Sequence, residues 1–83
     1  MSRDYTYRRI DGRELSDRIN HLGLSANDLM ILSGARRDRV LQWLRGEEDI
    51  PPYVDQITRV WIDVPGSLEA AQEWAREVAV RAR

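Results

Sequence analysis

Charged and amide side chains gather in the middle of the chain, in the stretch GARRDRVLQWLRG at residues 34–46. Arginine can grip a phosphate or a guanine with two parallel hydrogen bonds, and glutamine can grip an adenine in the same way. Such a run could equally be a solvated helix face. Whether this chemistry is used depends on how the neighbouring elements present these side chains.

The surrounding sequence predicts five helices. Asp11 and Ser25 are typical N-caps, and each has an acidic residue three positions later. Glycine is the usual residue just after a helix, and it stands at positions 23, 34 and 46. A third helix is therefore expected from about Arg36 to Leu44, directly after a glycine turn. Its Val40, Trp43 and Leu44 share one arc, which predicts the buried side.

Two further helices follow. The pair Pro51-Pro52 suits the start of a helix, and its predicted apolar stripe consists of Val54, Ile57, Trp61 and Val64. Ser67 is the expected cap of the last helix. The apolar seam of that helix recurs at spacings of three and four through Leu68, Ala71, Ala75, Val78 and Ala82.

The predicted organisation is a single all-α domain over residues 1–83. Residues 1–10 form an N-terminal arm or a short strand, because two tyrosines alternate there with polar residues. The arm could track a groove of DNA, pair with its copy in a dimer, or be disordered. Residues 11–64 form a four-helix core, and residues 65–83 form a C-terminal helix that could serve dimerisation.

The composition excludes several classes of protein. There is no cysteine and only one histidine, His21, so disulfides and a cysteine-ligated zinc are excluded and no metal or cofactor is expected. No nucleophile and base stand in an arrangement that predicts an enzyme. No run approaches the ~18 apolar residues of a membrane span. The expected location is the cytoplasm, in association with the nucleoid.

Charge is unevenly distributed along the chain. Residues 1–46 hold nine arginines against six acidic residues, whereas residues 47–83 hold four arginines against eight. The net charge of −1 argues weakly against a nucleic-acid partner, and the basic N-terminal half argues for one. All thirteen basic residues are arginine, a preference that a GC-rich genome also explains.

The sequence LSANDLMILSGARRDRVLQWLRG, residues 24–46, resembles the helix-turn-helix of the lambda-repressor-like family, Xre/Cro type. The residues that carry the resemblance are Ser25, Leu29, Gly34, Val40 and the ending Trp43-x-Arg45-Gly46. The proline-started helix that follows also fits, so the match covers about residues 11–64. The resemblance implies a second helix lying across the phosphate backbone and a third helix in the major groove of DNA.

The resemblance also implies roles for single residues. Base contacts would come from Arg37, Asp38, Leu41 and Gln42. Phosphate contacts would come from Ser25, Arg36, Arg39 and Arg45. Arginine pairs with guanine, glutamine with adenine, and aspartate with the cytosine amino group, while leucine can touch a thymine methyl. Asp38 has an alternative role, which is to complement the helix dipole or to pair with a neighbouring arginine.

The resulting hypothesis is a transcriptional repressor that binds a palindromic operator in double-stranded DNA as a homodimer. The seam of the last helix would supply the dimer interface, or would pack on the chain's own core. The alternative is a protein-interaction module, antitoxin-like or a phage adaptor, that holds a protein partner with its helical bundle and acidic C-terminal half.

Overall fold

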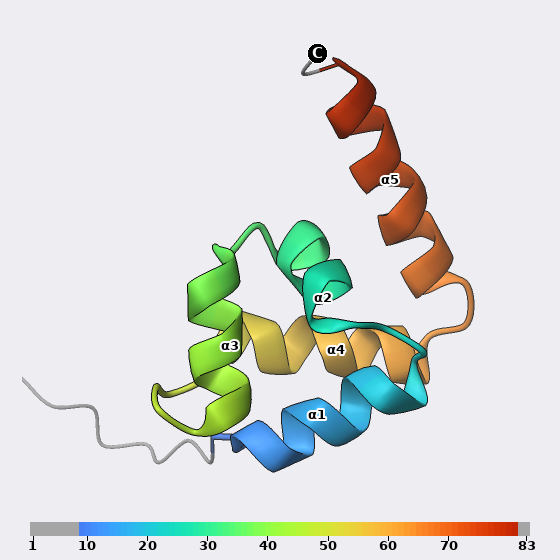
Figure 1. Cartoon of the computed structure of the whole chain (residues 1–83). Coiled ribbons are helices and arrows are strands. Elements are labelled where there is room, and N and C mark those ends of the chain that lie inside the picture. Colours follow the sequence, from blue (N-terminus) through green and yellow to red (C-terminus); the bar gives the residue numbers. More distant parts are fainter. Residues whose placement is uncertain (1–8, 82–83) are drawn as a thin grey trace, which may run out of the picture.

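The computed structural model describes residues 9–81, which form an all-α protein (Figure 1). Its helices are α1 (Gly12–His21), α2 (Ala26–Ser33), α3 (Arg37–Arg45), α4 (Pro52–Asp63) and α5 (Ser67–Arg81). No strand occurs within the described residues, so the predicted all-α class is confirmed. Residues 1–8 of the predicted arm and Ala82 of the predicted seam lie outside them.

Local signals set the ends of the first three helices. The Asp11 carboxylate accepts a hydrogen bond from the Glu14 backbone N–H at 2.8 Å. Ser25 and Asp28 form a reciprocal capping box. Gly34 and Gly46 end α2 and α3 in the left-handed conformation, each with a φ of 77°, which a glycine adopts without the steric cost of a Cβ.

The core lies among α1, α2, α3 and α4. Helix α3 packs against α1 and α2, and α1 also packs against α4. The buried apolar residues are Ile10, Leu15, Ile19, Leu24, Leu29, Val40, Trp43, Ile50, Val54 and Leu68. Ile10 belongs to this core although the sequence assigns it to the arm, because the chain already enters the bundle at that point; the Arg9 guanidinium donates to the Ile50 carbonyl at 3.4 Å.

The predicted stripe of α4 is only partly correct. Val54 is buried, but Val64 is 48% exposed, and the buried face continues through Asp55 and Thr58. These polar residues tolerate burial because the Arg18 guanidinium of α1 donates to the Asp55 carboxylate at 2.7 Å and to the Thr58 hydroxyl at 2.9 Å. Burial of a polar group is costly only when it lacks such partners.

Helix α5 packs on α2 and α4 and then extends beyond them (Figure 1). Ser67 does not act as the predicted cap. It is the first residue of the helix, and its hydroxyl donates to the carbonyls of Val60 and Val64 at the end of α4. Leu68 lies in the chain's own core, so this end of the predicted seam is used within the chain.

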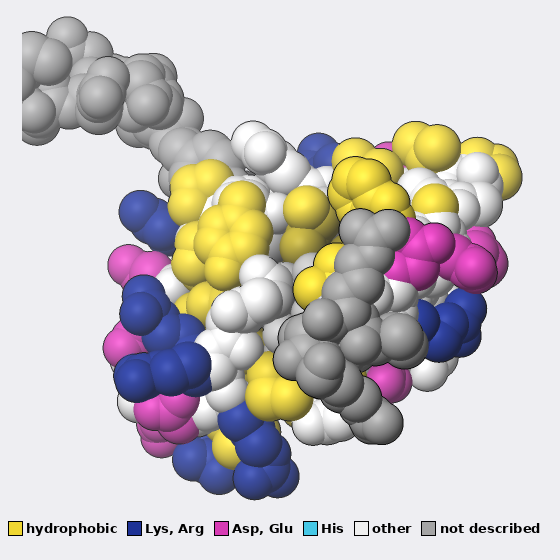
Figure 2. Space-filling model, turned by 90° about the horizontal axis from the view of Figure 1, so that it is seen from above, with side chains coloured by type: hydrophobic (Ala, Val, Ile, Leu, Met, Phe, Trp, Pro, Cys, Tyr) yellow, Lys and Arg dark blue, Asp and Glu magenta, His cyan; other side chains and the backbone are white. Residues whose placement is uncertain are grey.

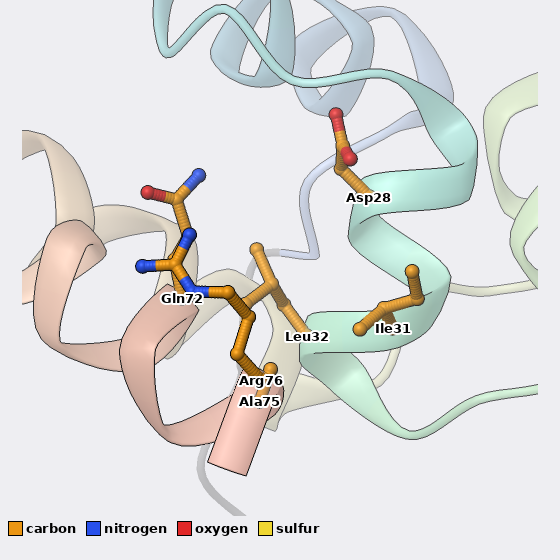
Figure 3. A pocket seen from close by; sticks show the side chains of 6 residues that line it. All are labelled: Asp28, Ile31, Leu32, Gln72, Ala75 and Arg76. Atoms are coloured by element: carbon orange, nitrogen blue, oxygen red, sulfur yellow. The ribbon is translucent and has the colours of Figure 1, made fainter. Parts of the chain in front are cut away.

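A hollow of about 340 Å³ remains between α2 and α5. Figure 3 shows Ile31 and Leu32 of α2 on one side and Gln72, Ala75 and Arg76 of α5 on the other. Helix α5 therefore packs less tightly on its neighbours than α3 does, and its buried contacts lie near Leu68.

Candidate nucleic-acid interface

Two buried side chains anchor α3. Val40 is fully buried and Trp43 is 1% exposed, and Leu29 of α2 is also fully buried in the same core. Helix α1 also holds α3 in place, because Gly12 lets the two backbones approach closely. A Cβ at position 12 would lie 2.5 Å from the Trp43 carbonyl oxygen and 2.7 Å from the Leu44 carbonyl oxygen. The C-terminal half of α3 is thus fixed, and its N-terminal end is free to project.

The connection between α2 and α3 is short and internally bonded. The Gly34 N–H donates to the Met30 carbonyl at 3.0 Å, and the Ser33 hydroxyl accepts from the Ala35 N–H at 3.2 Å. These bonds fix the direction in which α3 leaves the turn. At the other end of α2, the exposed Ser25 accepts from the Asp28 N–H at 3.1 Å, which leaves its hydroxyl proton available to donate.

The first turn of α3 is exposed. Arg36, Arg37, Asp38 and Arg39 are all exposed, as is Arg45 in the last turn. Leu41 and Gln42 are half-buried. Figure 2 shows arginine side chains, with carboxylates among them, along the edge of the molecule where α3 lies, at the other end from α5. The charged contact residues predicted around α3 are therefore exposed, whereas Leu41 and Gln42 are only partly accessible.

Two of these arginines have acidic partners in the chain. Arg36 lies 3.6 Å from Asp38, and Arg39 lies 3.2 Å from Glu48 in the loop after α3. The four side chains are 44–82% exposed, and ion pairs at such exposure contribute only ~0–1 kcal/mol. Within residues 9–81, Arg37 and Arg45 have no such partner. Among the arginines at the start of α3, Arg37 is therefore the one whose guanidinium has no acidic partner in the described part of the chain.

A polar hollow of about 300 Å³ adjoins this turn. Its lining includes Arg36, Arg39 and Trp43 of α3 and Tyr53 of α4. No side chain caps the N-terminus of α3, so N–H groups of its first turn are left without a side-chain acceptor. Tyr53 was not singled out by the sequence, because only the packing of α4 brings it beside α3.

The predicted dimer residues are divided between two environments. Leu68 is buried, Ala71 and Ala75 are half-buried, and Val78 is 65% exposed. Among residues 67–78 of α5, whose burial the structure describes, the most exposed large apolar side chain is Trp74, at 75%, and it stands outside the predicted seam. The seam thus faces the chain's own α2 and α4 near its start and solvent further along.

The described residues contain no group of histidine, cysteine, aspartate or glutamate side chains that could hold a metal ion. None of their helices combines the length and apolar character needed to cross a membrane. No protein-family model matches the chain, and no curated protein or solved structure matches it.

Proposed function

We propose that residues 11–64 form a lambda-repressor-like helix-turn-helix domain and that the protein is a sequence-specific DNA-binding transcriptional regulator. One observation carries the proposal. Helix α3 is anchored by Val40 and Trp43 while its first turn, Arg36–Arg39, is exposed. A recognition helix needs this division, because the N-terminal residues that reach base edges must project while the opposite face holds the helix in place.

Each exposed side chain takes a role that its position supports. Arg37 has no acidic partner among the described residues and would bind guanine, while Asp38, Leu41 and Gln42 would complete the base contacts. Phosphates would be held by Ser25 and the N-terminus of α2, and by Arg36, Arg39 and Arg45. The hollow beside α3 adds Tyr53 to this set, with its hydroxyl as a donor to a backbone phosphate.

The regulator is proposed to act as a homodimeric repressor on a palindromic operator. A single domain of this size contacts few base pairs, and each mismatch costs only ~1–3 kcal/mol, so selectivity in a genome requires two linked units. Two-fold symmetry then demands half-sites about 34 Å apart. Such a protein would be found in the cytoplasm with the nucleoid.

The test begins with selection of bound fragments from a random DNA pool, followed by titration of the selected site by fluorescence anisotropy at several salt concentrations. Arg37→Ala should cost ~1–3 kcal/mol on the selected site and relax the choice at one base pair. Arg45→Ala should weaken binding to all sequences alike and reduce the salt slope by about one. If both variants bind every sequence like the parent, α3 does not enter the groove.

A protein-interaction module is the second candidate, favoured by the exposed apolar side chains of Ile31, Trp74 and Val78. In that case the acidic C-terminal half would hold a protein partner and the arginines of α3 would be a solvated surface. Failure to select any DNA sequence, together with capture of one defined protein that Trp74→Ala abolishes, would favour this function over the regulator.

A further inference from the structure

The hollow between α2 and α5, here termed the α2–α5 hollow, has an apolar floor. Ile31 and Leu32 of α2 and Ala75 of α5 line it (Figure 3). Ile31 is 53% exposed, so the chain leaves part of this apolar surface open to solvent. The volume of about 340 Å³ lies in the usual range of small-molecule sites. None of the lining residues is among the proposed DNA contacts.

Helix α5 contributes donor groups to one side of this hollow. Gln72 and Arg76 are one helical turn apart and therefore lie on the same face of α5. The Gln72 amide has no hydrogen-bond partner within residues 9–81. Arg76 lies 3.3 Å from Glu73, but these side chains are 74% and 69% exposed, and an ion pair at such exposure is weak. Because a guanidinium has several N–H donors, Arg76 can bind a carboxylate together with Gln72.

Helix α2 contributes an acceptor to the other side. Asp28 is half-buried, and one of its carboxylate oxygens accepts from the Ser25 N–H at 2.9 Å. The other oxygen accepts no hydrogen bond from the described residues. A carboxylate with an open oxygen binds an ammonium group well. The α2–α5 hollow therefore offers a negative group on one helix and a positive group on the other (Figure 3), and its complement is a zwitterion with an apolar body.

The separation of the two helices sets the length of this zwitterion. A free amino acid carries its ammonium and carboxylate on the same carbon. The axes of packed helices lie about 8–10 Å apart, and an extended chain spans at most about 3.6 Å per residue. Two or three residues therefore reach from Asp28 to Arg76, and aliphatic side chains between the ends would cover Ile31 and Leu32. A fatty acid would leave Asp28 unpaired.

We propose that the α2–α5 hollow binds a short apolar peptide of two or three residues with free ends. Its carboxylate is held by Arg76 and Gln72, and its ammonium by Asp28. The site is independent of the proposed function, because neither the lining residues nor the test involves DNA. Since the two helices form the hollow only in the folded chain, bound peptide also stabilises the fold by mass action.

An NMR titration of the full, ¹⁵N-labelled chain with the dipeptide Leu-Leu tests the site. Saturable amide shifts should centre on residues 28–32 and 72–76. Acetylation of the amino end and amidation of the carboxyl end should each raise the dissociation constant by about tenfold, because each removes a charge-assisted hydrogen bond. Free leucine should bind more weakly than Leu-Leu, because it cannot reach both helices.

Two variants assign the ends of the peptide. Arg76→Gln should abolish the preference for the free carboxylate over the amide. Asp28→Asn should abolish the preference for the free amine over the acetylated form, and its amide oxygen can still accept from the Ser25 N–H. Arg13→Gln and Asp17→Asn are the matched controls, since both residues are exposed on α1, and they should bind like the parent. Circular dichroism verifies that all four variants fold.

Three results would overturn the proposal. The first is the absence of saturable shifts up to the solubility limit of Leu-Leu. The second is equal affinity for the free, acetylated and amidated peptides, which would reduce the site to a nonspecific apolar contact. The third is tighter binding of octanoate than of Leu-Leu in a manner sensitive to Arg76→Gln, which would identify the hollow as a site for fatty acids.

Discussion

Replacement of Gly12 by alanine tests how α3 is held in place. Gly12 is buried at the start of α1, directly against the backbone of α3. An added Cβ would stand 2.5 Å from the Trp43 carbonyl oxygen, where an ordinary contact needs at least 3.4 Å. The separation must therefore grow by about 0.9 Å. The obstacle is backbone, so a side-chain rotation cannot relieve it.

The expected loss of stability follows from two opposing effects. Overpacking a tight contact costs about 1–3 kcal/mol, and alanine regains at most about 1 kcal/mol of helix propensity over glycine, less at the first helical position. The net destabilisation should be about 1–2 kcal/mol. For a domain of this size it lowers the melting temperature by roughly 4–15 °C.

Urea and thermal unfolding followed by far-UV circular dichroism measure this change. Arg13→Ala is the matched control, because Arg13 is the exposed neighbour in the same helical turn and its replacement should be nearly neutral. An alanine at position 12 that leaves stability unchanged, or raises it, would show that α1 and α3 are not in the close contact described here.

Three further predictions concern contacts that the tertiary structure creates. Arg18→Met removes the 2.7 Å partner of the buried Asp55 carboxylate and leaves it the more distant Arg59 at 3.5 Å, so it should cost about 2 kcal/mol in urea unfolding; an Arg18→Met variant as stable as the parent would show that this ion pair is dispensable. Glu48→Gln releases Arg39 from its ion pair. DNA binding, measured by an anisotropy titration, should then become tighter by ~0.2–1 kcal/mol, and weaker binding would contradict this expectation. Tyr53→Phe removes only a hydroxyl and should weaken binding to all DNA sequences by about 1 kcal/mol, so an unchanged affinity would exclude the phenol from the interface.

Local chemistry allowed much of this fold to be predicted from residues close together in the chain. The caps at Asp11 and Ser25 need only a partner three residues away, and Gly34 ends α2 because it adopts a positive φ at little cost. The helical period likewise identified Val40 and Trp43 as buried. The exposed side of α3, which carries the candidate DNA contacts, follows from the same period.

The remaining features depend on residues far apart in the sequence. Arg18 and Asp55 are 37 positions apart, and nothing in a helical wheel predicts that a guanidinium would allow a carboxylate to be buried in α4. Gly12 beneath the α3 backbone and Tyr53 beside Arg39 likewise arise only from how helices pack. The sequence by itself determined where helices begin and end and which arc of each is apolar, because those signals act within one or two turns. Tertiary structure alone decided which apolar arc is covered, and therefore that Leu68 is buried while Trp74 is exposed.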